Sequence, residues 1–232
     1  MNKMRYEYKY MIDAVQETIL MIKATGIMSK DNHTMADGSY YIKSLYFDDY
    51  DNRCFYENEN GTNPREKFRI RYYNGDIGFL RLEKKVKING MTRKLSCAIT
   101  KEQCEIFMNG SIPDVDDSMP ESMKLLFTEM RLQKMVPKVI VAYRRIPFVY
   151  PIGNVRVTFD KELCSSTQVK DFLSNEVAFR PVLAAGCSVL EIKWDEIIPP
   201  FIKDYMQMDG LQWTNFSKYY LCRKYNLSGG IQ

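Results

Sequence analysis

The sequence has few of the residues on which common catalytic sites depend. Its single histidine, His33, lies in a polar stretch that is typical of a loop. One histidine argues against a histidine-based zinc site and against a Ser-His-Asp hydrolase. The six cysteines include no Cys-x-x-Cys pair, and a chain of 232 residues is too long to need disulfide staples. We therefore expect reduced, mostly buried thiols.

Long apolar runs are also missing. No stretch approaches the ~20 consecutive apolar residues that a membrane helix needs, and the N-terminal residues lead into no apolar signal-peptide core. These absences predict a cytoplasmic protein. The 33 basic residues are nearly balanced by 29 acidic ones, so the net charge of +4 does not by itself indicate nucleic-acid binding. The positions of the charges are more informative than their sum.

Segments with alternating side chains, rich in Tyr, Val, Ile and Phe, recur along the chain and predict an antiparallel β-sheet or barrel. They lie at about residues 4–10, 40–49, 66–73, 78–88, 92–98, 138–147, 154–160 and 188–194. Helical spacing is found at about residues 11–24, 101–108, 119–134 and 215–225, with Thr100 as a candidate cap. Because no shift in composition marks a boundary, we expect one domain over residues 1–227 and a flexible tail at 228–232.

Basic side chains gather on one face of the predicted strands. Residues two apart in a strand point the same way, so Lys67, Arg69 and Arg71 oppose an apolar face. The other charged faces carry Arg5, Glu7 and Lys9; Arg81, Glu83, Lys85 and Lys87; Arg156, Thr158 and Asp160; and Glu191 and Lys193. One such strand is ordinary in a sheet with a wet face. About five strands carry clustered Arg and Lys with few neutral polar neighbours, which indicates a functional surface and not an ordinary solvated face.

If these strands close into a barrel with the apolar face outward, the charged face lines the bore. Two cations ~6 Å apart at an effective dielectric of ~20 repel by roughly 3 kcal/mol, a large fraction of a domain's stability. An anion should therefore occupy the bore. The planar fork of arginine and the compact charge of lysine suit a chain of phosphates. Nucleic acid is disfavoured, because the aromatic side chains lie opposite the cations and form no base-stacking platform beside them.

Eight short motifs follow one another along most of the chain. They are residues 5–10 (RYEYKY), 44–48 (SLYFD), 67–72 (KFRIRY), 82–85 (LEKK), 143–145 (YRR), 155–160 (VRVTFD), 190–193 (LEIK) and 216–219 (FSKY). None is diagnostic alone, but their order and spacing resemble the vacuolar transporter chaperone (VTC) domain, the polyphosphate polymerase branch of the triphosphate tunnel metalloenzyme superfamily. The resemblance implies an α+β fold: a closed eight-stranded antiparallel β-barrel, the triphosphate tunnel, with helices packed on the outside.

The resemblance also implies a set of functional residues. The positions of the phosphate-contacting, catalytic cations are taken by Lys9, Arg69, Arg71, Lys85, Arg145, Arg156 and Lys218. Further phosphate-binding candidates are Lys94, Lys193, Arg5 and Ser217. Glu191 takes the place of the metal ligand for Mn²⁺ or Mg²⁺, with Glu7 and Glu83 as the other candidates.

Some of these assignments have alternatives. Arg144 could replace Arg145, and Arg93 could replace Lys94, although we favour 145 and 94. Glu191 could instead be only the ion-pair partner of Lys193, with the metal held by Glu7 or Glu83. Lys9 and Lys218 could be ordinary surface lysines.

By resemblance, the chain is expected to transfer the γ-phosphate of ATP to a growing polyphosphate chain with the help of a divalent metal. Many members of the superfamily open with Glu-x-Glu-x-Lys, whereas Arg5 stands in the first position here, which favours the polymerase branch. The alternatives are a triphosphatase or polyphosphatase that uses the same tunnel, and a non-catalytic polyphosphate-binding module. We expect ATP and polyphosphate as partners, no nucleic acid and no membrane segment of its own; a membrane-bound partner stays open.

Overall fold

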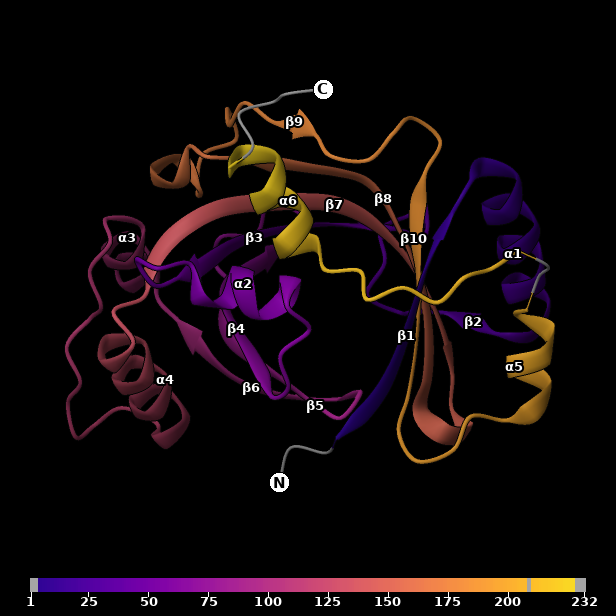
Figure 1. Ribbon diagram of the computed structural model, residues 1–232, viewed down its shortest axis with the longest axis horizontal. Helices are drawn as coiled ribbons and strands as arrows, with labels where there is room; N and C mark the ends of the chain where they lie inside the picture. The colour runs from indigo at the N-terminus through magenta and orange to yellow at the C-terminus, as the bar shows by residue number, and fades with distance from the viewer. Residues whose placement is uncertain (1–3, 208–209, 228–232) are drawn as a thin grey trace.

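The computed structural model describes residues 4–207 and 210–227, so the predicted tail at 228–232 lies outside the described residues. All eight predicted strand segments are confirmed (Figure 1). They are β1 (Arg5–Ile12), β3 (Tyr40–Asp48), β4 (Arg65–Tyr73), β5 (Leu80–Ile88), β6 (Met91–Ile99), β7 (Val136–Tyr150), β8 (Val155–Ser166) and β10 (Ser188–Trp194). Two-residue strands, β2 (Ser29–Lys30) and β9 (Arg180–Pro181), pair antiparallel with β7 and β8.

The eight long strands form a closed antiparallel barrel, as expected. Their order is β7-β3-β4-β5-β6-β1-β10-β8, and β8 pairs with β7 to complete the ring. The joint between β1 and β6 is the shortest, because only Arg5 with Thr92 and Tyr6 with Met91 are in register there. Closure gives every long strand two neighbours and encloses one face of the sheet.

The sequence predicted some of the helices and missed others. They are α1 (Ala14–Ile27), α2 (Arg53–Glu59), α3 (Lys101–Met108), α4 (Glu121–Leu132), α5 (Pro200–Tyr205) and α6 (Lys218–Leu227), with short 3₁₀ turns at Ile152–Asn154 and Val169–Asp171. Thr100 caps α3 as predicted, since its side chain accepts a hydrogen bond from the backbone N–H of Gln103. The short α2 and α5 were not predicted. Asn52 precedes α2 in a left-handed conformation and gives no side-chain cap, and the first N–H groups of the helix are bound instead by the carboxylates of Asp48 and Asp49.

The apolar strand faces point outward and are covered by helices. Phe68 and Ile70 of β4 belong to a buried cluster with Phe107 of α3 and Phe127 of α4. A second cluster joins β8 and β10 to α1 and α5. Burying one such Phe side chain stabilises the fold by roughly 1.5–3 kcal/mol. The charged faces are therefore left to line the interior.

Two helices, α2 and α6, are drawn across the ring of strands (Figure 1). The Tyr219 ring of α6 stacks on Tyr46 of β3 at 5.4 Å, and its hydroxyl donates to Asp48. Asp48 also accepts hydrogen bonds from the backbone N–H groups of Cys54 and Phe55 in α2. These contacts hold both helices at one mouth of the barrel. No helix in the described part of the chain is long and apolar enough to cross a membrane.

Candidate active site in the barrel bore

The barrel encloses a cavity of about 120 Å³ lined mainly by charged side chains. This is several times the ~10–15 Å³ that one water needs. Ten cationic residues line it: Lys9, Arg65, Lys67, Arg69, Arg71, Lys85, Lys87, Arg145, Lys193 and Lys218. Two carboxylates, from Glu7 and Glu191, and the uncharged residues Tyr46, Asn58, Tyr143, Thr214, Asn215, Phe216, Ser217 and Tyr219 complete the lining. The cavity therefore has a large excess of positive charge.

The side chains that line this cavity come from the strands and from the segment that leads into α6. Lys67, Arg69 and Arg71 alternate with the buried Phe68 and Ile70 along β4, which aims the three cations inward. The segment 214–217 and the start of α6 line the cavity from the mouth.

Lys9 and Lys218 come from opposite ends of the chain and meet in the bore. The ammonium of Lys9 donates to the backbone carbonyl of Phe216 at 3.2 Å, and that of Lys218 lies 3.3 Å from Glu191. Neither is an ordinary surface lysine, since Lys218 is only 7% exposed and Lys9 lines the cavity.

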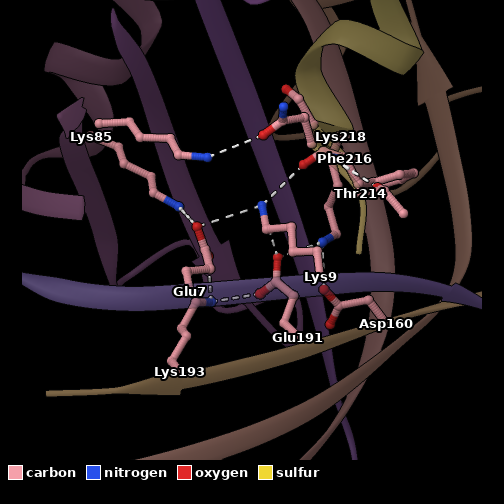
Figure 2. A network of polar contacts seen from close by, with 12 residues as sticks. Glu7, Lys9, Lys85, Asp160, Glu191, Lys193, Thr214, Phe216 and Lys218 are labelled. Atoms are coloured by element: carbon pink, nitrogen blue, oxygen red, sulfur yellow. Dashed lines mark hydrogen bonds and ion pairs between the residues drawn. The ribbon is translucent and has the colours of Figure 1, made fainter. Parts of the chain in front are cut away.

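Glu191 lies at the centre of a network of ion pairs (Figure 2). Its carboxylate lies 2.5 Å from the ammonium of Lys193, 3.1 Å from the guanidinium of Arg145, and 3.3 Å from the ammonium groups of both Lys9 and Lys218. Burial alone would raise the pKa of this carboxyl, but the four cations hold it well below its usual value. Glu191 is therefore ionised at neutral pH.

Two further carboxylates balance the same cations. Glu7 lies 2.7 Å from the ammonium of Lys85 and 3.7 Å from that of Lys9. Asp160, which the resemblance does not single out, is fully buried, receives two hydrogen bonds from Arg145 at 2.5 and 2.6 Å, and pairs with Lys218 at 2.5 Å. Alternation along β8 places Asp160 on the charged face, which is the signal that could have identified it.

Two tyrosines support the arginines of β4. The Arg69 guanidinium donates to the Tyr46 hydroxyl at 2.9 Å, and that of Arg71 donates to the Tyr143 hydroxyl at 3.0 Å. Burial alone would raise the pKa of Tyr46, but Arg69 and Arg71 hold it below its ordinary value. Neither tyrosine was predicted as a site residue. Their hydroxyls fix the guanidinium forks toward the cavity.

Two lysines in the cavity have pKa values that are lowered by burial and by neighbouring cations. Burial lowers the pKa of Lys85 to about 7. The carboxylate of Glu7 acts to raise this pKa, and repulsion from Lys9 offsets part of that effect. Burial also lowers the pKa of Lys67, and Lys9, Arg65 and Lys85 lower it further. Lys67 has only neutral partners, Asn58 Oδ1 at 2.7 Å and Ser217 Oγ at 2.6 Å. An anion would offset this repulsion.

Not every candidate from the sequence lines the cavity. The guanidinium of Arg5 pairs with Asp195 at 2.8 Å, Arg156 pairs with Asp31, and the ammonium of Lys94 lies 2.9 Å from Glu83. Glu83 itself is buried behind the cavity wall. It lies 2.6 Å from Arg69 and holds that arginine in place. The other candidates, Lys9, Arg69, Arg71, Lys85, Arg145, Lys193, Lys218, Ser217, Glu7 and Glu191, all line the cavity.

The structure also places the two pairs of alternative registers. Arg145 points into the bore, whereas Arg144 pairs with Asp37 and Ser39 outside it. Lys94 contacts Glu83 on the charged face, whereas Arg93 is one residue out of phase; both side chains are exposed and neither lines the cavity. The placement of Arg145 agrees with the favoured register, and the choice of Lys94 over Arg93 as a phosphate-binding residue stays a prediction.

A divalent cation would find two carboxylates in the cavity. No group of three or more His, Cys, Asp or Glu side chains suited to a metal occurs within residues 4–207 and 210–227. Glu7 and Glu191 offer hard oxygen donors, and Oε1 of Glu7 makes no hydrogen bond, only an ion pair with Lys193 at 3.3 Å. Mg²⁺ is often bound by one or two carboxylates together with substrate phosphates. The pair therefore fits a cation that enters with a phosphate ligand.

Comparison with known proteins supports the architecture. A sequence profile of the VTC domain matches residues 4–226. No curated protein matches the sequence.

Solved structures share the fold at low sequence identity. A Hippeastrum protein, described as a candidate adenylyl cyclase with dominant triphosphatase activity, has a TM-score of 0.55 and 12% identity, over 100% of this chain and 98% of its own. A Pyrococcus horikoshii protein has a TM-score of 0.50 and 14% identity, over 95% of this chain and 98% of its own. A Bacillus halodurans protein, described as a candidate adenylate cyclase, has a TM-score of 0.50 and 11% identity, over 89% of this chain and 87% of its own. Such likeness shows a common fold.

Proposed function

This chain belongs to the VTC domain family, and from that premise we propose that it is a polyphosphate polymerase. It would transfer the γ-phosphoryl group of ATP to the terminal phosphate of an inorganic polyphosphate chain. A terminal oxygen of the polymer forms the new P–O bond, the bond between the γ-phosphorus and the β–γ bridging oxygen breaks, and ADP leaves with the electron pair.

The observation that carries this proposal is the charge of the enclosed cavity, where ten cations face two carboxylates. A single carboxylate or monophosphate would neutralise little of that excess. A chain of phosphates supplies one negative charge or more at each unit and fits a bore whose side chains repeat along the strands. The cavity therefore suits a linear polyanion.

The chemistry requires positioning and charge stabilisation more than a protein base. The attacking phosphate oxygen is already ionised, so the lack of a histidine in the bore is no obstacle. Arg69, Arg71 and Arg145 present guanidinium forks to the equatorial oxygens of the transferring group. Lys218 remains an ammonium, because Asp160 and Glu191 raise its pKa against the effect of burial.

Glu191, with Glu7 beside it, would hold the Mn²⁺ or Mg²⁺ ion that accompanies ATP. When bound, this ion neutralises phosphate charge and helps to orient the chain. The lysines now paired with these carboxylates, Lys9, Lys85 and Lys193, are then free to turn to phosphate oxygens. The ion pairs of the free protein thus keep the cations aimed at the bore.

The second candidate function is hydrolysis of triphosphate in the same bore. It is favoured by the Hippeastrum protein, which shares the fold and is described as a triphosphatase. Against it, Arg5 stands where many hydrolases of the superfamily have a glutamate, and its guanidinium pairs with Asp195. Strand β1 therefore contributes one carboxylate to the bore, from Glu7, where paired glutamates would contribute two.

Incubation of the pure protein with ATP and Mn²⁺ tests the proposal. The expected product is long-chain polyphosphate, visible by gel electrophoresis and formed together with ADP. Release of orthophosphate without polymer would establish the hydrolase instead, and triphosphate binding without ADP formation would indicate a binding module.

Glu191→Gln is expected to lower the rate of polymer synthesis by about 10²–10³-fold, because it removes a charged group that holds the metal and the cations. Glu121→Gln, an exposed carboxylate at the start of α4, removes the same charge and should leave the rate unchanged. Thermal unfolding of both variants separates a loss of chemistry from a loss of fold. Equal rates for Glu191→Gln and the unaltered protein would exclude this role.

A further inference from the structure

The two mouths of the barrel differ in how their cations are paired. Along β4 the inward cations follow the order Arg65, Lys67, Arg69, Arg71, and Lys67 touches Asn58 of α2 and Ser217 beside α6. Arg65 therefore marks the mouth that carries these two helices, which we call the α2–α6 mouth. In register, Lys87 of β5 lies beside Arg65, whereas Arg81 lies beside Arg71 at the far end.

Three cations at the α2–α6 mouth have no carboxylate partner. Lys67 donates to Asn58 and Ser217, and Lys87 donates to Asn215 at 3.5 Å, all through neutral oxygens. Arg65, Lys67 and Lys87 make no ion pair with any described residue. Glu57, the carboxylate that acts on Arg65, is held by Arg53 at 2.9 Å. Neutral partners fill hydrogen-bonding positions without cancelling charge.

The opposite mouth is largely neutralised. Lys9 contacts Phe216 at the α6 side, so Arg5, four residues earlier on β1, lies toward the other end, where it pairs with Asp195 at 2.8 Å. Asp160 likewise contacts Lys218 of α6, and Arg156, four residues earlier on β8, pairs with Asp31. Arg71, which lines the cavity, and Arg81, which lies beyond it, face this end without an ion pair in the described chain. Arg71 donates to the hydroxyls of Ser44 and Tyr143, and the Arg81 guanidinium lies over the Phe79 ring at 5.0 Å.

A polyanion that leaves the reacting centre meets unequal surroundings in the two directions. Toward the opposite mouth it must compete with Asp195 and Asp31 for their arginines and approach those carboxylates. Toward the α2–α6 mouth it meets three uncompensated cations, together with the amides of Asn58 and Asn215, which can turn their N–H groups toward phosphate oxygens. Electrostatic attraction therefore favours the path toward the α2–α6 mouth.

From this asymmetry we infer that the polyphosphate chain extends out through the α2–α6 mouth, where Arg65, Lys67 and Lys87 bind the phosphates beyond those at the reacting centre. The inference rests on the proposed polyphosphate substrate and adds the polarity of its path. Arg65 and Lys87 thereby become subsites for long chains, distinct from the residues around Glu191.

Lys87→Gln and Arg81→Gln form a matched pair, because they lie on one strand, face opposite mouths and each remove one positive charge. Isothermal titration with tripolyphosphate and with a medium-chain polyphosphate measures the advantage of the longer ligand. Lys87→Gln should reduce the affinity for the longer chain about two- to fivefold, and Arg65→Gln/Lys87→Gln about tenfold, with smaller effects on tripolyphosphate. Arg81→Gln should leave the advantage of the longer chain intact.

The salt dependence gives a second readout. The slope of log Kd against log salt for the longer chain should shrink by roughly one for each phosphate contact removed at Arg65 or Lys87, and stay unchanged in Arg81→Gln. A loss confined to Arg81→Gln would reverse the polarity, and equal losses in both variants would show that no mouth is preferred; either result overturns the inference. If the unaltered protein binds neither ligand, the proposed function fails with it.

Discussion

Lys85 is the cavity residue whose charge should respond most directly to a bound anion. Burial lowers its pKa to about 7, so at pH 8 in the free protein much of Lys85 is in the neutral amine form. A phosphate beside it stabilises the charged form and raises the pKa again. Anion binding should therefore be coupled to proton uptake at Lys85, and this contribution to affinity should fall as the pH rises through 7.

Titration of tripolyphosphate at pH 8 in buffers of different ionisation enthalpy counts the protons exchanged. We expect Lys85→Arg to take up fewer protons than the unaltered protein, by an amount approaching one, because a guanidinium stays charged throughout. The ligand's own titration is common to both proteins and cancels. Identical proton counts for the two proteins would show that Lys85 is already charged before the ligand arrives.

Strand alternation predicts which side chains face the bore but not how far along it they lie. Arg69 and Arg71 could be placed on the charged face from their spacing alone, and both line the cavity. Arg156 follows the same rule, yet its guanidinium turns to Asp31, a residue 125 positions away in the chain. Such long-range ion pairs depend on the closure of the barrel, which local periodicity does not encode.

At the scale of elements, the strands were more predictable than the helices at the mouth. Long alternating segments bury one face and so leave a strong pattern, whereas α2 has only seven residues and receives no side-chain cap from Asn52, the residue before it. Its position depends on tertiary contacts, above all on Asp48, which accepts hydrogen bonds from two backbone N–H groups of α2 and from the hydroxyl of Tyr219 in α6. One buried carboxylate thus joins β3, α2 and α6.

Adjacent tyrosines of α6 allow a matched test of this junction. Tyr219 is 1% exposed and donates to Asp48 at 2.5 Å, whereas Tyr220 donates to Glu59 at 3.0 Å in an exposed contact. Tyr219→Phe should lower the free energy of unfolding by about 1–3 kcal/mol, since it leaves a buried carboxylate short of a donor. Tyr220→Phe should lie within about 0.5 kcal/mol of the unaltered protein. Urea denaturation measures both, and equal losses would mean that Asp48 does not hold the mouth together.

For the molecule as a whole, the barrel is a compromise between apolar packing outside and like charge inside. The outer clusters stabilise the closed ring, and the ion pairs of Glu7, Asp160 and Glu191 offset part of the repulsion within it. Closure itself was implied by family resemblance, because alternation predicts equally an open sheet with one wet face. The seam between β1 and β6, with two residue pairs in register, is the weakest joint of the ring.

A polyanion should therefore stabilise the whole barrel, because it replaces repulsion among the cavity cations with attraction between those cations and the ligand. Tripolyphosphate at 100 times its dissociation constant should add about 2.7 kcal/mol to the free energy of unfolding, equivalent to a rise in Tm of roughly 5–10 °C for a chain of this size. Orthophosphate at the same ionic strength controls for general salt effects and should raise Tm much less, because it spans few of the ten cations. Added sodium chloride should diminish the shift. Equal shifts with both phosphates would place the stabilisation on the exterior and argue against an enclosed site.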